Sequence, residues 1–384
     1  MKKPSDVFTP GALPESTYIT RKTVLGFTYE ERLRQALNMN GYLTSISGPS
    51  KIGKTVLCEK VIGLDKLVEV SGSDFSEKEK LWVEIGSKAG MPLAGLFTSN
   101  HSENTTIAEE YLITRENVID YYKENEYVLL LDDFHYADLS MQTYMAQQFK
   151  DAIRKGLKVI ISSLPHRSDD AIRTNPDLQG RISIIDIEAW SKDELMEIPK
   201  RGFGELSATI SDECIQKLVD ESLASPQLMQ LICLNICVLA NIDKEKHLPI
   251  EKEIVEKAFR FSTLNLDYQK VAETIKQGKC QRGKERRKFK TKRFGEIDLY
   301  ELILEAIADD PPVSYVGFEN LAERINSIII EEEKPSAKAM KDYLNNIQDV
   351  IEQKGRSYEV IEWREDVLYV IEALFIFYLR WGRA

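Results

Sequence analysis

The chain has 384 residues, of which 43% are hydrophobic and 29% are charged. This length and composition exclude a single small module and a disordered or fibrous chain. With 51 Lys and Arg against 62 Asp and Glu the formal charge is -11, so a nucleic-acid contact would need a local basic patch.

Five cysteines, an odd number without a Cys-x-x-Cys spacing, argue against a disulfide framework or a zinc site and favour a reducing cytoplasm. The first 22 residues lack the apolar stretch of a secretory signal. The longest apolar run, 367–381, is interrupted by Glu372 and is too short to cross a bilayer. We therefore expect a cytoplasmic protein that makes no membrane contact.

Short apolar strands alternate with helices in the first 190 residues. Thr28 and Glu31 predict a capping box, and apolar residues at helical spacing follow them. Other helices are expected from 54 and over 76–87, 106–125 and 139–155, with a loop at 91–104; strands are expected at 42–47, 67–70, 127–131, 158–163 and 182–187. This alternation is typical of a parallel sheet covered by helices, so we expect an α/β domain over 1–190.

Only helical patterns follow in the segment 191–275, which we expect to form a helical lid domain; its helices are expected at 192–200, 212–223, 226–240 and 250–261. The stretch 276–293 holds ten Lys or Arg and one Glu, which predicts a mobile loop or linker. Three helical patterns and then a two-stranded hairpin in 294–384 give the order of a winged-helix domain.

Residues 48–55 match the phosphate-binding pattern G-x-x-x-x-G-K-[ST]. Glycines at both ends of the loop permit backbone N–H groups to face a polyanion, and the helix that begins there adds the positive end of its dipole. Lys54 is expected to reach the β and γ phosphates of a nucleotide, and Thr55 to bind Mg²⁺. The residues expected to contact the nucleotide are Gly48, Pro49, Ser50, Lys51, Ile52, Gly53, Lys54, Thr55 and Val56.

Two aspartates end the apolar strand 127–131. Open α/β sheets place ligands at the carboxyl ends of their strands, so we expect Asp132 to hold the Mg²⁺ and Asp133 to orient or deprotonate the attacking water. Ser162 and Ser163 end the next strand and are candidates for sensing the γ phosphate, although two serines also begin many loops. His135 is more simply explained as a surface histidine.

Together these motifs resemble AAA+ and STAND ATPases, and in particular the prokaryotic STAND-type and origin-recognition-like members. The resemblance covers nearly the whole chain and includes Leu178-Gln179-Gly180-Arg181 and Trp190-Ser191-Lys192-Asp193-Glu194-Leu195. It implies that Arg181 is an arginine finger that a neighbouring subunit inserts at the γ phosphate, with Arg167 and Arg173 as rivals. It also implies that Pro226, in Ala224-Ser225-Pro226, lies near the adenine, with alanine in place of the family's glycine. Tyr18 and Ile19 resemble the segment that lines the base pocket.

One departure from the family pattern is that no arginine occurs between Arg201 and Arg260, where AAA+ proteins keep a γ-phosphate contact. This favours a mechanism like that of STAND proteins, in which the bound nucleotide mainly stabilises one conformation. We expect an ATP- and Mg²⁺-dependent switch that self-associates through its ATPase domain, engages a separate effector protein and acts in prokaryotic defence or stress signalling. The alternative is a DNA-binding ATPase of the initiator or transposition type.

The partner of the C-terminal part is a separate question. Residues 276–293 carry a net charge of +9, whereas 294–384 carry 19 acidic and 9 basic residues. The helix expected at 336–353 balances Lys338 and Lys341 with Asp342, Asp349 and Glu352, although a helix that enters the major groove normally carries surplus positive charge. The winged helix is therefore interpreted as a protein-contact or autoinhibitory module. The stretch 276–293 is a candidate nucleic-acid contact, or alternatively a segment that docks on the acidic C-terminal domain and keeps the molecule closed.

Overall fold

The computed structural model describes residues 2–75, 77–91, 94–101, 104–111, 113–164, 175, 178, 180–242, 249–279, 286–330, 332–355 and 358–382, with the backbone alone for 94–111. The described residues divide into two compact units. One comprises 1–19, 50–52 and 190–384, and the other comprises 20–49 and 53–189. Among the described residues no helix is long and apolar enough to span a membrane.

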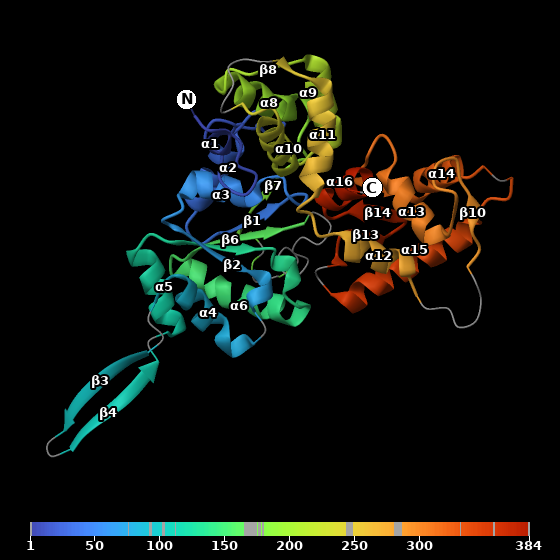
Figure 1. The fold of residues 1–384 in the computed structure, drawn as a ribbon. Coiled ribbons are helices and arrows are strands. Elements are labelled where there is room, and N and C mark those ends of the chain that lie inside the picture. Colours follow the sequence, from blue (N-terminus) through green and yellow to red (C-terminus); the bar gives the residue numbers. More distant parts are fainter. Residues whose placement is uncertain are drawn as a thin grey trace. The chain divides into compact units, whose positions relative to one another are not determined.

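The second unit is built on a parallel sheet with the strand order β2-β5-β6-β1-β7 (Figure 1). Its strands are β1 (Leu43–Ser47), β2 (Leu67–Ser71), β5 (Val128–Asp132), β6 (Lys158–Ser163) and β7 (Ile182–Asp186). β5 is an apolar run that ends at Asp132, β6 has an apolar centre, and β1 combines Leu43 and Ile46 with three small hydroxyl residues. Nearly all residues of these three strands are buried because helices cover both faces of the sheet. The predicted α/β fold with a helix-covered parallel sheet is confirmed.

Helices α2 and α3 lie on one face of this sheet, and α4, α5 and α6 lie on the other (Figure 1). Thr28 and Glu31 form the predicted capping box, with Glu31 N 3.1 Å from Thr28 Oγ1 and Thr28 N 2.8 Å from Glu31 Oε2. The helices are α2 (Tyr29–Leu37), α3 (Lys54–Ile62), α4 (Leu81–Lys88), α5 (Arg115–Glu124) and α6 (Leu139–Arg154), and the short 3₁₀ turns are η1 (Gly72–Asp74), η2 (Lys78–Lys80) and η3 (Phe134–Tyr136).

The first half of the helix expected over 106–125 and the loop expected over 91–104 were wrong, whereas the second half of that helix is present as α5. Residues Ala94–His101 form β3 and Asn104–Tyr111 form β4, an antiparallel pair, and α5 begins only at Arg115. Thr114 explains the late start, because its side chain accepts a hydrogen bond from Asn117 N, 3.3 Å away, as a helix cap. The helix expected over 76–87 begins at Leu81, after the turn η2; Ser76 lies outside the described residues.

The first unit contains two buried hydrophobic clusters. One is formed by the N-terminal segment and the helices α1 (Pro4–Val7), α8 (Lys192–Glu205), α9 (Asp212–Glu221), α10 (Pro226–Leu239) and α11 (Lys252–Thr263). β8 (Thr209–Ile210) and β9 (Pro249–Ile250) pair beside these helices. The four helices predicted for this part are all present.

The second cluster of this unit includes α12 (Gln269–Gln277), which the sequence analysis did not predict, and the helices α13 (Leu299–Ala308), α14 (Phe318–Ile328) and α15 (Ala337–Lys354). The hairpin of β13 (Ile361–Arg364) and β14 (Val367–Val370) follows them, and β12 (Tyr315–Gly317) adds a third strand beside β14. The last helix, α16 (Ala373–Trp381), gives Phe377 to the first cluster and Phe375 to the second.

The stretch 276–293 was expected to be a mobile linker, and its described part is structured instead. Lys276 and Gln277 belong to α12, and β10 (Phe289–Lys290) pairs with β11 (Glu296–Ile297). Phe289 is 4% exposed and belongs to the buried cluster. The apolar Phe289 was overlooked because ten Lys or Arg residues surround it in the sequence.

Candidate functional site

The loop 48–55 joins β1 to α3 in the way that the motif demands. Gly53 is the residue before the helix and has φ 95°, in the left-handed region that glycine adopts without strain. Because Gly53 has no side chain, the N–H groups of the first turn of α3 have no side-chain cap. Four such N–H groups at the positive end of a nine-residue helix are suited to bind an anion.

The Lys54 side chain is held against the loop. Its Nζ donates to the carbonyl oxygens of Gly48 and Pro49, at 2.9 Å each, and the residue is only 8% exposed. A buried ammonium group needs oxygen partners because desolvation disfavours its charged form. The interactions hold a positive charge at the mouth of the loop, where a phosphate could replace the carbonyl partners.

Thr55 and Asp132 come together although they are far apart in the sequence. Thr55 Oγ1 lies 2.7 Å from Asp132 Oδ2. A hydroxyl and a carboxylate oxygen are ligands that Mg²⁺ prefers, and Mg²⁺ usually takes only one or two protein ligands beside water and phosphate oxygens. No cluster of three or more His, Cys, Asp or Glu suited to a metal occurs among the described residues, so the pair fits this mode and not an all-protein cage.

Asp133 has an unusual backbone conformation. Its φ of 50° lies in the left-handed region, and it begins the turn η3. Its N–H donates to Asp132 Oδ1 at 3.0 Å. Aspartate tolerates this conformation better than most residues, but it still costs free energy and is commonly found at functional positions.

Ser162 and Ser163 lie between these two groups in the sheet. β6 separates β1 from β5, and Ser163 pairs in register with Ser47, which directly precedes the loop. Both serines are 0% exposed, and neither hydroxyl has a hydrogen-bond partner among the described residues. An unsatisfied buried hydroxyl is costly, so both can serve a bound ligand or a water molecule. His135 is partly exposed, as expected for a residue near the surface, but both of its ring nitrogens are buried and its ring lies 4.2 Å from that of Tyr136, centroid to centroid.

The structure also identifies residues that sequence reasoning missed. Ser47 Oγ donates to Asp186 Oδ1 at 2.5 Å, at the carboxyl ends of β1 and β7. Arg21 Nη2 donates to the carbonyl oxygens of Glu188 and Ala189, at 2.9 and 3.0 Å. No local pattern marks either contact, because the partners are more than 100 positions apart.

Arg181 does not lie with the loop of its own chain. It directly precedes β7, and its carbonyl oxygen accepts from Leu43 N at the start of β1, whereas the loop follows the end of that strand. The two ends of β1 are separated by four residue steps of about 3.3 Å each. Its rivals Arg167 and Arg173 lie outside the described residues.

Tyr18, Ile19 and Pro226 all belong to the first unit. Tyr18 O accepts from Arg201 Nη1 at 3.2 Å, and Ile19 is buried with the helices that follow Trp190. Ser225 caps the helix that Pro226 begins. Ala224 has φ 56°, a left-handed backbone that glycine would adopt without strain.

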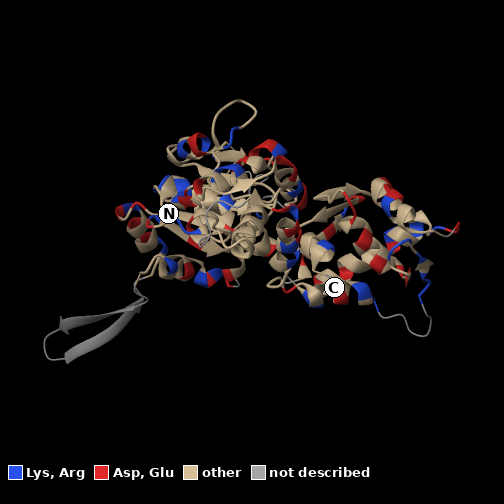
Figure 2. Ribbon diagram, turned by 45° about the horizontal axis from the view of Figure 1, so that its top comes forward, with Lys and Arg blue, Asp and Glu red and all other residues tan. Residues whose placement is uncertain are grey.

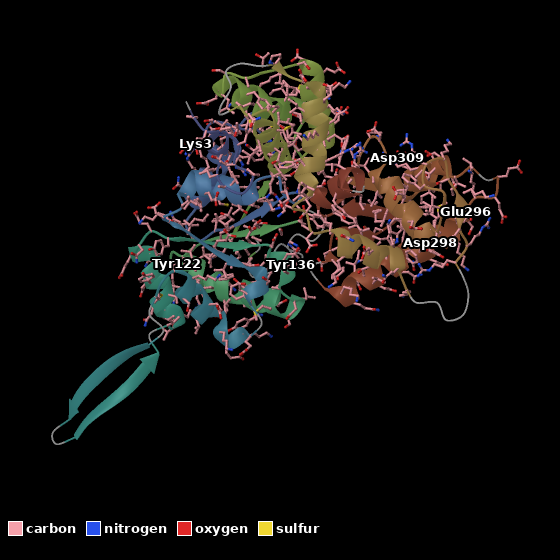
Figure 3. All side chains as sticks on the ribbon, in the orientation of Figure 1. Lys3, Tyr122, Tyr136, Glu296, Asp298 and Asp309 are labelled. Carbon is pink, nitrogen blue, oxygen red and sulfur yellow. The ribbon has the colours of Figure 1, made fainter. Side chains whose placement is uncertain are left out.

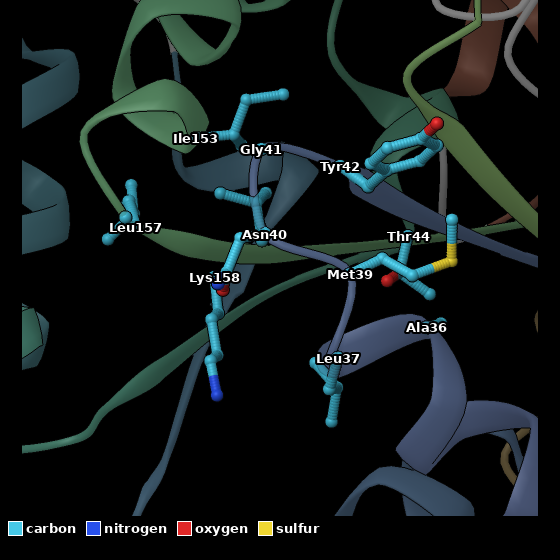
Figure 4. Close-up of a pocket in the computed structure, with 12 residues that line it drawn as sticks. Ala36, Leu37, Met39, Asn40, Gly41, Tyr42, Thr44, Ile153, Leu157 and Lys158 are labelled. Carbon is cyan, nitrogen blue, oxygen red and sulfur yellow. The ribbon is translucent and has the colours of Figure 1, made fainter.

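A hollow of the second unit lies at the amino ends of the strands, whereas the loop lies at their carboxyl ends. It is lined by residues at and just before the starts of β1 and β6, among them Tyr42 and Lys158 (Figure 4). The loop follows the other end of β1, so this hollow has no part in the phosphate site.

No protein-family model and no curated protein matches the chain. Among solved structures it is similar to Cdc6p of Pyrobaculum aerophilum, at 16% identity, with 98% of this chain and 97% of that chain covered and a TM-score of 0.46. It is also similar to the ORC2 protein of Aeropyrum pernix in its ADP form, at 15% identity, with 96% of this chain and 94% of that chain covered and a TM-score of 0.49. A third similar structure is the RuvB Holliday junction branch migration motor of Thermotoga maritima, at 14% identity, with 91% of this chain and 95% of that chain covered and a TM-score of 0.42. At these identities and TM-scores the likenesses add nothing to what the site itself indicates.

Proposed function

We propose that the chain is an ATPase of the AAA+ or STAND type that binds ATP with Mg²⁺ at the loop 48–55. The observation that supports this most directly is the 2.7 Å approach of Thr55 Oγ1 to Asp132 Oδ2 beside the uncapped start of α3. The nucleotide supplies the phosphoryl group, and the metal supplies positive charge for its oxygens. Lys54 and the first-turn N–H groups bind the β and γ phosphates.

Asp133 is proposed as the residue that orients or deprotonates the attacking water. Its carboxylate follows Asp132 at the end of β5, and its position is set by the left-handed backbone. Ser162 and Ser163 are proposed to donate their buried hydroxyls to the γ phosphate or to that water. Arg181, at the other end of the sheet, would act on the site of a neighbouring subunit, so turnover in the isolated chain is expected to be slow.

Phosphate release by the full chain tests the enzymatic part of this proposal. Asp133→Asn should reduce the turnover of ATP by at least about 100-fold and leave ATP binding nearly unchanged, because the carboxylate acts on water and not on the phosphates. Asp120→Asn, on the exposed side of α5, is the matched control and should turn over ATP like wild type. Equal rates for the two variants would remove Asp133 from the mechanism.

The switch is a second part of the proposal: the nucleotide state controls self-association or the engagement of an effector protein, possible settings being defence or stress signalling. Differential binding of ATP and ADP to two conformations is the only way in which a nucleotide shifts such an equilibrium. Light scattering of the chain with ADP, with a non-hydrolysable ATP analogue and without nucleotide measures this. One particle size in all three conditions would contradict the switch.

The alternative is a DNA-binding ATPase of the initiator or transposition type. It is supported by the order of α13, α14, α15 and the three-stranded antiparallel sheet, which is that of a winged helix. The charges of α15 oppose groove binding, since Lys341 is paired with Asp366 and the exposed Lys338 is offset by the exposed Asp342. Acidic and basic positions are mixed throughout residues 294–384 (Figure 2). We therefore favour a protein contact for this domain.

A further inference from the structure

The hairpin of β10 and β11 is anchored in the core of its unit. Phe289 pairs with Ile297, and both are buried, at 4% and 8% exposure. Lys290 and Glu296 are the next pair and are exposed, because successive strand residues face opposite sides. The hairpin therefore has one buried face and one face in solvent.

Arg286 fixes the base of this hairpin. Its Nη1 donates to Lys276 O at 3.1 Å and to Asp298 Oδ2 at 3.0 Å, and its guanidinium lies 4.6 Å from the centroid of the Tyr300 ring. Asp298 is labelled in Figure 3 beside Glu296 of β11. Arg286 is thus a structural cation and is not available to a partner.

The turn between the two strands is held by four hydrogen bonds. Thr291 N and Thr291 Oγ1 both donate to Gly295 O at 2.9 Å, and Phe294 N donates to Thr291 Oγ1 at 2.9 Å. Lys292 N donates to Ile328 O at 3.1 Å. This network presents Lys292, Arg293 and Phe294 in a fixed arrangement, which lowers the entropy cost of binding a partner.

Three cations of the hairpin have no carboxylate partner among the described residues. Arg287 pairs with Glu333 and Lys290 with Glu296, whereas the exposed side chains of Lys288, Lys292 and Arg293 form no ion pair with any described residue. Phe294 follows directly and is 43% exposed, without a ring contact within the described part of the chain. Lys292, Arg293 and Phe294 are consecutive in the turn and form a small amphipathic surface, and Lys288 directly precedes β10 of the same hairpin.

We propose that this surface, Lys288 with Lys292, Arg293 and Phe294, binds single-stranded nucleic acid. The cations would contact backbone phosphates, and the Phe294 ring would stack on an unpaired base, the combination by which proteins bind single strands without reading their sequence. Bases in a duplex are already stacked and paired, so the ring has no partner there. This inference goes beyond the proposed ATPase function and does not depend on it.

An anionic membrane is a poorer fit to the same residues. One phenylalanine gives little apolar area to insert, and 294–384 carry 19 acidic against 9 basic residues, which an anionic lipid surface repels. An acidic protein would satisfy the cations but would leave the ring without a stacking partner.

Fluorescence anisotropy of the full chain with a labelled single-stranded oligonucleotide, without ATP, tests the proposal. Wild type should bind, with a slope of log K against log salt of about -2 for three phosphate contacts. Phe294→Ala should weaken binding by about 5- to 150-fold, the usual loss of one stacked base. Lys292→Gln with Arg293→Gln should weaken binding and make the slope shallower. The matched controls are Lys338→Gln and Tyr315→Ala, an exposed lysine and an exposed aromatic residue of the same unit, and both should bind like wild type.

Several outcomes would overturn the proposal: no binding by wild type at low salt, wild-type affinity in the Phe294 and the double variants, or equal affinity for a duplex of the same sequence. Binding to phosphatidylserine vesicles that depends on these residues, without binding to the oligonucleotide, would replace it with a membrane contact. Thermal melting should match wild type in the hairpin variants and the two controls because their substituted side chains are exposed. Lys54→Ala should keep oligonucleotide binding, so a failed nucleotide site and a failed hairpin site give different results.

Discussion

Gly72 lies directly against the backbone of Asp133, so that a β-carbon at Gly72 would be 2.5 Å from Asp133 O and 2.9 Å from the Cα of Phe134. Both residues follow the carboxyl ends of neighbouring strands, β2 and β5. The space at Gly72 therefore permits the left-handed conformation in which Asp133 is held.

Gly72→Ala should displace the Asp133 backbone, because both of the closest atoms belong to main chain and cannot rotate away. We expect the free energy of unfolding to fall by about 1–3 kcal/mol and the ATPase rate to fall by about 10- to 100-fold through misplacement of the carboxylate. Urea unfolding and phosphate release measure the two effects.

The control for this change is Gly204→Ala, on α8, where a β-carbon meets no atom within 4 Å. It should stabilise the helix by up to about 1 kcal/mol and leave the ATPase rate unchanged. Wild-type turnover in Gly72→Ala would show that the position of Asp133 does not depend on this contact.

Ala224→Gly should raise the stability of the chain. Ala224 has φ 56°, and a left-handed conformation costs a residue with a β-carbon about 1–2 kcal/mol. Part of the gain is lost because glycine has more freedom in the unfolded chain, so a net increase of about 0.5–1 kcal/mol is expected in urea unfolding. Ala224→Val should lower the free energy of unfolding. If Ala224→Val were more stable than Ala224→Gly, the backbone at this position would not be strained.

The ion pair of Arg380 and Glu221 should contribute strongly to stability. Arg380 Nε lies 2.9 Å from Glu221 Oε2 and Arg380 Nη2 lies 2.7 Å from Glu221 Oε1. Oε2 also accepts a hydrogen bond from Trp381 Nε1. Both side chains are largely buried, at 12% and 8% exposure. Glu221→Gln removes the buried carboxylate and leaves Arg380 only the 80% exposed Asp310, 3.3 Å away, as an ion-pair partner among the described residues, so we expect a loss of about 2–4 kcal/mol.

An exposed ion pair provides the comparison. Lys252 and Glu213 are 56% and 78% exposed, and Lys252→Gln should change the free energy of unfolding by less than about 1 kcal/mol. If Glu221→Gln and Lys252→Gln both unfold at the same denaturant concentration as wild type, the buried ion pair does not stabilise the packing of α16 against α9.

The described cysteines should resist alkylation in the native protein at mildly alkaline pH. Cys58, Cys214, Cys233 and Cys237 are free and buried. Burial raises the pKa of the Cys237 thiol to about 12, and burial together with the charge of Asp132 raises the pKa of Cys58. A raised pKa leaves little of the reactive thiolate. Mass spectrometry should find these four modified by iodoacetamide only after denaturant is added; rapid native modification of Cys58 would contradict its burial in α3.

The sequence was informative where one segment alone determines structure. The loop 48–55, the apolar strands and the capping box of Thr28 are local patterns, and each leaves a periodicity or a fixed spacing. The pair β3 and β4 left no such signal, because residues 106–113 fit a helical period as well as a strand and the two strands pair only with each other.

Contacts between distant positions could not be predicted. Asp186 approaches Ser47 only because β7 lies beside β1, and Gly72 approaches Asp133 only because β2 lies beside β5. The structural role of Arg286 was hidden for a similar reason, since a cation among ten Lys and Arg residues is more simply explained as solvated until Asp298 and Tyr300 are placed around it.

Calorimetric titration of ATP with Mg²⁺ into the full chain tests the nucleotide site most directly. We predict a saturable heat for wild type that Lys54→Ala weakens by at least about tenfold, because the variant loses a charged contact to the phosphates. Lys257→Ala, an exposed lysine of α11, should bind like wild type. The absence of heat with wild type, or wild-type affinity in Lys54→Ala, would contradict a phosphate site at the loop 48–55.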